Sequence, residues 1–174
     1  MVKNNIIAII TDQDFTLTPE YMQNPLFDHF GHDRQQFWDE SQDEHKRREK
    51  IINSEELFPE DLRAPEGIQR AHACYEVTYA DMILEHIKRG CPKDGKKWEG
   101  LNRKLLRELG KKIEFFPGLP EAVREEKDFV RSNSEWQRHN IKLEWHIISL
   151  GITDMIMGSA ISKYVDGIFA YEFA

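Results

Sequence analysis

IIAIITDQDFTL, residues 6–17, carries the clearest structural signal in this sequence. Its first five residues form a continuous apolar run that ends at the polar residues Thr11 and Asp12. Such a run predicts a strand that is buried on both faces, as in a parallel sheet. Two carboxylates, Asp12 and Asp14, follow where this strand ends. Since ligands of open α/β sheets bind at the carboxyl ends of the strands, these residues are the first candidates for a functional site.

Further apolar runs indicate two more strands. LEWHII, residues 143–148, predicts the second strand, and residues 168–171 predict the third. Helical patterns separate the three runs, and helices between successive strands predict a parallel sheet. The longest helical pattern covers residues 66–89, and residues 33–52 predict a solvated helix with many charges. The sequence therefore predicts an α/β fold with a long helical section after the first strand.

Composition excludes several classes of protein. The chain has 174 residues, and its 31 acidic residues outnumber 24 Lys and Arg, for a formal charge of -7. An acidic chain is a poor partner for nucleic acid, whose phosphates require a basic face. No apolar run approaches the roughly 20 residues that span a bilayer, so no membrane association is expected. Two cysteines, Cys74 and Cys91, cannot form a disulfide framework, which favours reduced thiols and a cytoplasmic protein.

The Asp12 and Asp14 pair has two interpretations. Neighbouring carboxylates repel each other unless a cation or a proton lies between them. A hard cation such as Mg²⁺ takes oxygen ligands, and one Asp can then act as nucleophile while the other acts as acid and base. The alternative is a turn in which both side chains accept hydrogen bonds from nearby amides. The apolar strand before the pair and Phe-Thr-Leu after it favour a functional site.

Three segments together resemble the haloacid dehalogenase superfamily. IIAIITDQDFTL resembles its first motif, four hydrophobic residues followed by Asp-x-Asp-x-Thr. EFFPGLPEAV, residues 114–123, is similar to the re-entry from cap to core, and residues 146–173 are similar to the second motif with its following helix and strand. The resemblance implies a Rossmann-like parallel-sheet core formed by residues 1–18 and 116–174, with an inserted helical cap at residues 19–115.

The resemblance also implies roles for individual residues. Asp12 would attack phosphorus and form an aspartyl-phosphate, and Asp14 would protonate the leaving group and then activate water. Ser149 and the Leu150 backbone N–H would bind the phosphoryl group. Thr16 would belong to the same phosphate-binding set and would brace the Asp14 loop. The Asp12 carboxylate and the Asp14 backbone carbonyl would hold Mg²⁺. The implied activity is hydrolysis of a small phosphorylated metabolite, a phosphomonoester.

One departure from the family concerns its third and fourth motifs. These supply a Lys and one or two acidic residues, and both normally follow the region that ends here at Ala174. Lys163 lies too soon after Ser149, within the intervening helix, and is interpreted as a solvated residue. The core is therefore expected to be incomplete, and the chain truncated, with little or no activity. The alternative is a non-catalytic fragment that serves as a binding or interaction module.

In the family that the sequence resembles, the first strand lies between the strand that ends in the second motif and the strand that carries the fourth. The resemblance therefore implies that residues 6–10 are left at an edge of the sheet. An apolar edge strand is a template for pairing with another chain, and monomers seldom expose such a patch. We therefore expect either self-association through or near this strand, or a C-terminal part that stays bound to it.

Two histidines, His29 and His32, flank Phe30-Gly31. Histidine is a frequent metal ligand, but the spacing offers no convincing partners, so both are interpreted as polar loop residues.

Overall fold

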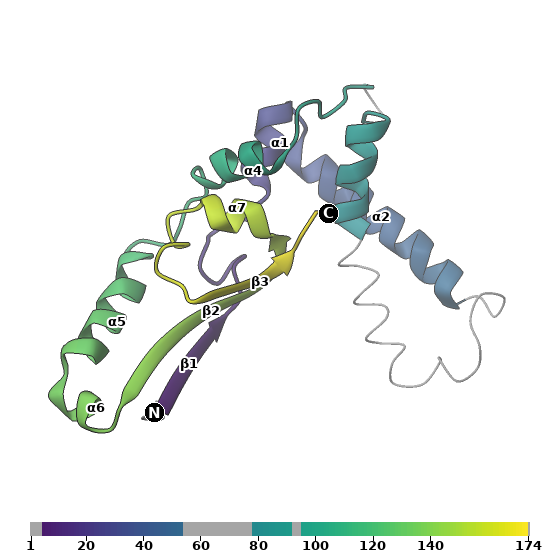
Figure 1. Ribbon diagram of the computed structural model, residues 1–174. Helices are drawn as coiled ribbons and strands as arrows, with labels where there is room; N and C mark the ends of the chain where they lie inside the picture. The colour runs from purple at the N-terminus through teal and green to yellow at the C-terminus, as the bar shows by residue number, and fades with distance from the viewer. Residues whose placement is uncertain (1–4, 54–77, 92–94, 174) are drawn as a thin grey trace. The chain divides into compact units, whose positions relative to one another are not determined.

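A computed structural model describes residues 5–53, 78–91 and 95–173 of the chain (Figure 1). The chain divides into two compact units. The first, called here the sheet unit, joins residues 1–26 to residues 102–174, and the second, the helical unit, comprises residues 27–101. The sequence predicted an inserted cap at residues 19–115. The contacts within the chain assign residues 19–26 and 102–115 of that range to the sheet unit.

The sheet contains three strands, β1 (Asn5–Thr11), β2 (Ile141–Ile152) and β3 (Gly167–Tyr171). Their order is β1-β2-β3, and both neighbouring pairs are parallel (Figure 1). Each apolar run that predicted a strand lies in one. The prediction of an α/β fold with a parallel sheet is therefore confirmed, and the arrangement is consistent with a Rossmann-like fold.

Helix α5 (Glu121–Ser132) contacts β2. Its buried residues are Val123, Lys127 and Val130, which recur every three or four positions as in any amphipathic helix. Lys127 Nζ donates to Asp166 Oδ2 at 2.6 Å and to the Tyr164 carbonyl at 2.9 Å. This buried cation therefore ties α5 to the segment that leads into β3.

Helices α4 (Arg103–Gly110) and α7 (Thr153–Gly158) pack together through glycines. A Cβ at Gly110 would overlap the Met155 carbonyl, and a Cβ at Gly158 would overlap the Arg107 carbonyl. The buried Asp154 carboxylate accepts hydrogen bonds from Arg103 Nε and Arg107 Nε, both at 2.8 Å. Close backbone contact and this double ion pair fix α4 against the helix that follows β2. A short helix, α6 (Ser134–Arg138), connects α5 to β2.

In the helical unit, α1 (Asn24–Phe30) begins in the sheet unit and ends here, and α2 (Arg34–Asn53) follows it. Asp33 Oδ1 accepts the Gln36 N–H at 2.7 Å, which confirms the predicted helix start. Residues 78–88 are helical, as predicted, and residues 66–77 of that prediction lie outside the described residues. Arg48 pairs with Asp81 at 2.7 Å and joins these two helices. Among the described residues, no helix combines the length and apolar character that a membrane span requires.

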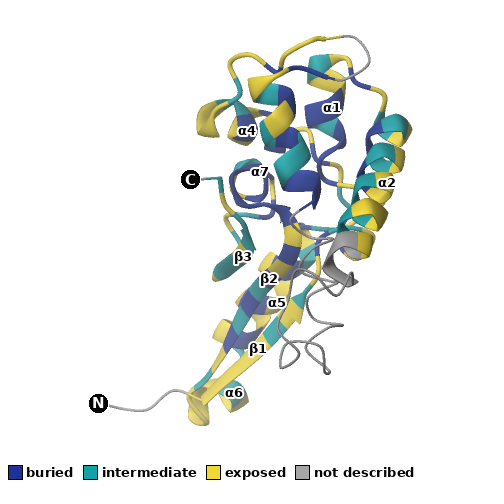
Figure 2. Cartoon of the chain, turned by 90° about the vertical axis from the view of Figure 1, so that its right-hand side faces the viewer, coloured by how far each residue is buried: buried dark blue, intermediate teal, exposed yellow. Residues whose placement is uncertain are grey.

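The predicted burial of the first strand is wrong. Ile6, Ile7 and Ile10 of β1 are 55%, 43% and 62% exposed, and Figure 2 shows β1 exposed along most of its length. Within the described residues, β1 has a strand neighbour on one side only, and α5 contacts β2. An apolar run reports a preference for burial, whereas burial itself requires other elements to cover both faces.

We predict that Lys127→Met destabilises the sheet unit. Burial works against the charged form of Asp166, but the hydrogen bonds from Lys127 Nζ and the Trp145 N–H outweigh it and lower the pKa of this carboxyl. Removing the cation leaves a part-buried carboxylate without its partner, which costs about 1–3 kcal/mol of the free energy of unfolding. Urea unfolding measures this. The exposed Lys112 is the matched control, and equal effects of Lys112→Met and Lys127→Met would contradict the prediction.

Candidate active site at the carboxyl edge of the sheet

A tight turn follows β1 and shapes the candidate site. The Gln13 carbonyl accepts the backbone N–H groups of Leu17 at 2.9 Å and Thr18 at 3.2 Å. The buried Thr18 hydroxyl contacts the same carbonyl at 3.2 Å and the Glu20 carbonyl at 2.8 Å. Phe15 takes a left-handed conformation with φ 58°, which lets the chain reverse within a few residues. The carboxylates of the first motif are therefore held on a closed turn.

Thr16 was expected to brace this loop. Its side chain is exposed, and the hydrogen bonds that close the turn come from the buried Thr18 instead. The sequence offered no signal for Thr18, because hydroxyl residues two positions apart are equivalent until the turn geometry is known. The predicted place of Thr16 beside a phosphate remains a prediction.

Asp14 is linked to the end of β2 through one residue. The Met22 backbone N–H donates to Asp14 Oδ1 at 2.8 Å, and a Cβ at Gly151 would overlap the Met22 sulfur. Gly151 in turn donates its N–H to Ser149 Oγ at 2.9 Å. Because Gly151 has no side chain, the Met22 side chain can lie against the end of β2 while the Met22 N–H binds Asp14. Nothing in the sequence pattern indicated Met22.

The strand register brings Asp12, Asp14 and Ser149 to one edge of the sheet. Thr11, the last residue of β1, pairs with Ile147 of β2, and both strands run in the same direction. Ser149 is buried, whereas Asp12 and Leu150 are exposed. The structure thus brings the two aspartates of the first motif and the serine of the second motif together, from segments far apart in sequence.

Both aspartates also accept hydrogen bonds from amides, as the turn interpretation expected. Asp12 Oδ1 accepts the Gln13 N–H at 2.7 Å, and Asp14 Oδ1 accepts the Met22 N–H at 2.8 Å. Each of these bonds uses one oxygen of its carboxylate. The turn and the functional site are therefore compatible, because the hydrogen bonds orient both groups and leave a second oxygen on each.

Burial makes the Asp14 carboxyl a weaker acid than usual. It raises the pKa of Asp14 from 3.8 to about 6, with a further increase from the negative charge of Asp12, while the Met22 N–H opposes both. A carboxyl group with this pKa holds a proton for part of the time near neutral pH. Such a group can donate a proton and later accept one, which is the requirement for acid and base catalysis.

The donor set at this edge fits a hard divalent cation. Two carboxylates repel each other here, since the charge of Asp12 contributes to the raised pKa of Asp14, and a cation between them would remove that repulsion. Mg²⁺ is commonly held by one or two carboxylates together with water and substrate phosphate. Asp12 and Asp14 are not joined by a third metal-ligating side chain among the described residues. The one group of three such side chains there lies in the helical unit.

Lys163 has the solvated position that the sequence predicted. It is exposed, and its Nζ lies 4.8 Å from the centroid of the Tyr164 ring. Contact with a neighbouring ring gives no indication that it acts at the carboxyl edge.

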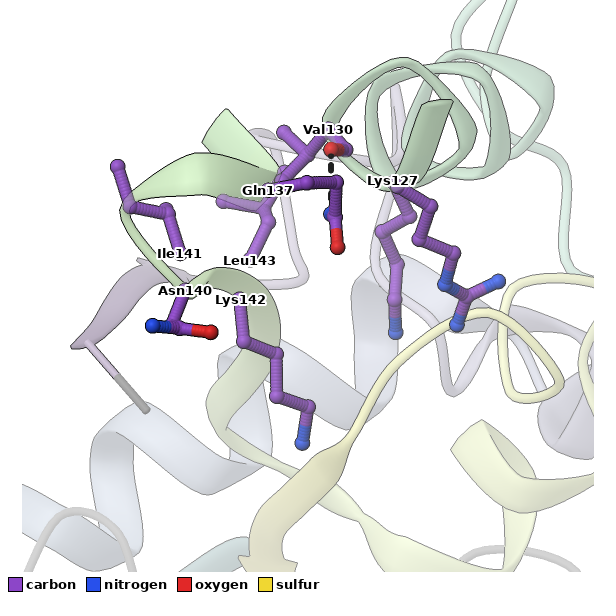
Figure 3. Close-up of a pocket in the computed structure, with 8 residues that line it drawn as sticks. Lys127, Val130, Gln137, Asn140, Ile141, Lys142 and Leu143 are labelled. Carbon is purple, nitrogen blue, oxygen red and sulfur yellow. Dashed lines mark hydrogen bonds between the residues drawn. The ribbon is translucent and has the colours of Figure 1, made fainter. Parts of the chain in front are cut away.

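A pocket lies at the opposite end of β2 from the aspartates, and no motif pointed to it (Figure 3). It has a volume of about 220 Å³ and contains three cationic side chains, Lys127, Arg131 and Lys142. Each has a carboxylate partner: Asp166 at 2.6 Å, Asp128 at 3.5 Å and Glu144 at 2.7 Å respectively. Because these charges are neutralised within the chain, the pocket is a weaker candidate than the aspartate pair.

Comparisons with known proteins give one distant relative. An uncharacterized protein of Borreliella burgdorferi is 28% identical over 178 aligned positions, which cover 98% of this chain and 51% of the relative. The chain thus spans about half the length of the curated relative that it matches. No family model matches the chain, and no solved structure matches it. The sheet and its edge define an α/β protein with a paired-aspartate site.

We predict that Asp14→Asn stabilises the protein at neutral pH. Between pH 3.8 and about 6, the folded state keeps the Asp14 proton that the unfolded state loses. The free energy of unfolding must therefore fall as pH rises through this window, by about 2–3 kcal/mol. The variant lacks this dependence, and its amide oxygen can still accept the Met22 N–H. Urea unfolding at pH 4 and pH 7 measures the effect, and the exposed Asp128→Asn is the control. A wild-type protein whose stability rises across the window, in parallel with the variant, would contradict it.

Proposed function

We propose that the sheet unit is the catalytic core of a haloacid dehalogenase-like phosphatase that hydrolyses a small phosphomonoester. The observation that carries the proposal is the geometry of the carboxyl edge, where the Met22 N–H holds Asp14 and the register of β1 with β2 brings Ser149 to the same edge. Burial, which raises the pKa of Asp14 to about 6, supports a role in proton transfer. The resemblance of residues 6–17 and 146–173 to the first two family motifs supports the same activity.

In the proposed reaction, an oxygen of the Asp12 carboxylate attacks phosphorus while the bond to the ester oxygen breaks. Asp14 gives its proton to the departing oxygen, so that an alcohol leaves and an aspartyl-phosphate remains on Asp12. The Asp14 carboxylate then takes a proton from water, and the water oxygen attacks phosphorus. Inorganic phosphate leaves, and both carboxyl groups return to their starting states.

Positioning of the phosphoryl group would come from the end of β2. The Ser149 hydroxyl accepts the Gly151 N–H at 2.9 Å, so its own proton is available to a phosphoryl oxygen. The Leu150 backbone N–H is the second donor that the resemblance implies. When held by the Asp12 carboxylate and the Asp14 backbone carbonyl, Mg²⁺ would neutralise charge on the phosphoryl oxygens. Catalysis of this kind depends on orientation and charge neutralisation, so every donor matters.

The 174-residue chain alone is expected to turn over slowly. The resemblance requires a Lys and further acidic residues that the sequence does not supply at matching positions. Removal of one charge-stabilising donor commonly lowers the rate by about a hundred- to a thousandfold. Formation of the covalent intermediate is therefore a better test than turnover.

We predict that a reactive acyl phosphate with Mg²⁺ phosphorylates Asp12. Its good leaving group needs no protonation, so Asp14→Asn should still be labelled and should retain the label longer, because no base activates water. Asp12→Asn should remain unlabelled. Intact-mass spectrometry followed by peptide mapping measures both results, with Asp128→Asn as the control. Equal labelling of Asp12→Asn, or no labelling of any variant, would contradict the proposed chemistry.

A second candidate function is association through β1. An apolar pocket of about 430 Å³ lies beside the exposed strand, and its apolar lining consists of Ile7, Ile9, Leu143, Phe129, Val130 and Trp136. An edge strand with free backbone groups next to an apolar pocket can pair with an identical strand and extend the sheet. We propose a second copy of the chain as the occupant of this edge.

Association predicts that Ile7→Lys converts a dimer into a monomer. The substitution removes an apolar side chain from the pocket, whose lining also includes Glu125 and Glu126, and Lys on an edge strand opposes pairing. Light scattering over a range of concentrations measures the mass. The control is Met157→Lys, which places the same charge at an exposed apolar residue of a different element, α7. A wild-type chain that is monomeric at high concentration would refute this association.

A further inference from the structure

Three metal-ligating side chains meet in the interior of the helical unit, whereas the residues of the proposed reaction belong to the sheet unit. One ligand atom each of His32, His86 and Cys91 lies within 4.8 Å of the other two. All three residues are buried, with 9%, 2% and 3% exposure respectively. His32 does lie in the loop between α1 and α2, but it is buried, which its interpretation as a polar loop residue did not anticipate. His29 is exposed, but it lies in helix α1 and not in a loop.

Local backbone geometry brings these residues together. His32 follows the end of α1, where its N–H donates to the Phe27 carbonyl at 2.9 Å. His86 lies in the helix at residues 78–88, and the Gly90 N–H donates to its carbonyl at 3.1 Å. Gly90 has φ 89°, a conformation that favours glycine, and a Cβ there would lie 2.5 Å from the Gly95 carbonyl oxygen. This turn returns Cys91 to the side of the helix that carries His86.

The surroundings favour a bound ion over an ordinary polar cluster. His32 Nε2 is fully buried and has no hydrogen-bond partner among the residues that the structure describes. The His86 ring stacks on Trp98 at 5.0 Å, and the His32 ring meets the edge of Phe37 at 5.7 Å. Burial of a polar nitrogen without a partner among aromatic rings costs free energy, and native proteins rarely leave such a group unpaired. A cation bound to Nε2 would satisfy it.

The donor chemistry selects the metal. Two imidazole nitrogens and one thiolate sulfur suit a borderline-soft ion such as Zn²⁺, whereas Mg²⁺ and Ca²⁺ require oxygen. With metal–ligand bonds of about 2.0–2.3 Å, tetrahedral coordination places ligand atoms roughly 3.3–3.8 Å apart. Atoms within 4.8 Å of one another reach that spacing through a contraction of about 1 Å. Three protein ligands leave the fourth position to a solvent molecule.

We propose that His32, His86 and Cys91 bind one Zn²⁺ ion that stabilises the helical unit. The ion would connect the residue after α1, the helix at residues 78–88 and the turn at Gly90. Binding free energy at such a site adds to folding free energy, because the unfolded chain has no preformed site. This site is independent of the paired aspartates, and it implies two different metals in one chain.

Metal analysis of the full chain, without an affinity tag, tests the proposal. After removal of metal by a chelator and titration with zinc, elemental analysis should give one zinc per chain. Cobalt in place of zinc should give the absorption band of thiolate-to-cobalt charge transfer. Cys91→Ser should abolish this band, and Cys91→Ser and His32→Gln should each weaken zinc binding by more than about a hundredfold, since even loss of a supporting group outside the ligand set costs 10–100-fold.

Matched controls are His29→Gln, three positions from His32 and exposed, and Cys74→Ser, which removes the other thiol. Both should keep one zinc and the cobalt band. Zinc should also raise the thermal unfolding midpoint of the wild-type chain, a measurement that holds even if the ligand variants fail to fold. Substoichiometric zinc in the wild type, equal zinc in wild type and Cys91→Ser, or loss of zinc in either control would overturn the proposed ligand set.

Discussion

Parallel pairing of β1 with β2 is the interaction on which the sheet unit depends. The two strands come from opposite ends of the sequence, and their register, Asn5 with Ile141 through Thr11 with Ile147, fixes where each strand ends. Parallel strands require a long crossover connection, and the helical unit lies within that connection. A shift of this register would separate Ser149 from the aspartates, so the proposed chemistry rests on backbone hydrogen bonds between distant segments.

The two aspartates show how the surroundings give identical side chains different properties. Asp12 is exposed at the end of β1, whereas Asp14 is partly buried, near a negative charge and bound to the Met22 N–H. Burial disfavours the charged form of a carboxyl, and one amide donor offsets only part of that effect. The result is a pair in which one group suits attack on an electrophile and the other suits proton transfer.

Close contacts at glycine residues shape both units. Gly110 and Gly158 each lie where a side chain would overlap a neighbouring backbone carbonyl, so α4 and α7 can approach only because these positions are glycine. In the helical unit, Gly90 turns the chain in a conformation that favours glycine, and Cys91 follows it near His86.

The sequence by itself determined the class of fold and the position of the principal candidate site. Apolar runs with helical patterns between them specify a parallel sheet, and a polar pair directly after the first run specifies its carboxyl edge, because both signals are local. Exposure of Ile6, Ile7 and Ile10 was decided by tertiary structure, since a strand is buried only where other elements cover it. The same holds for Thr18, Met22 and the cluster of His32, His86 and Cys91, whose roles come from segments that meet in space and leave no periodic signal along the chain.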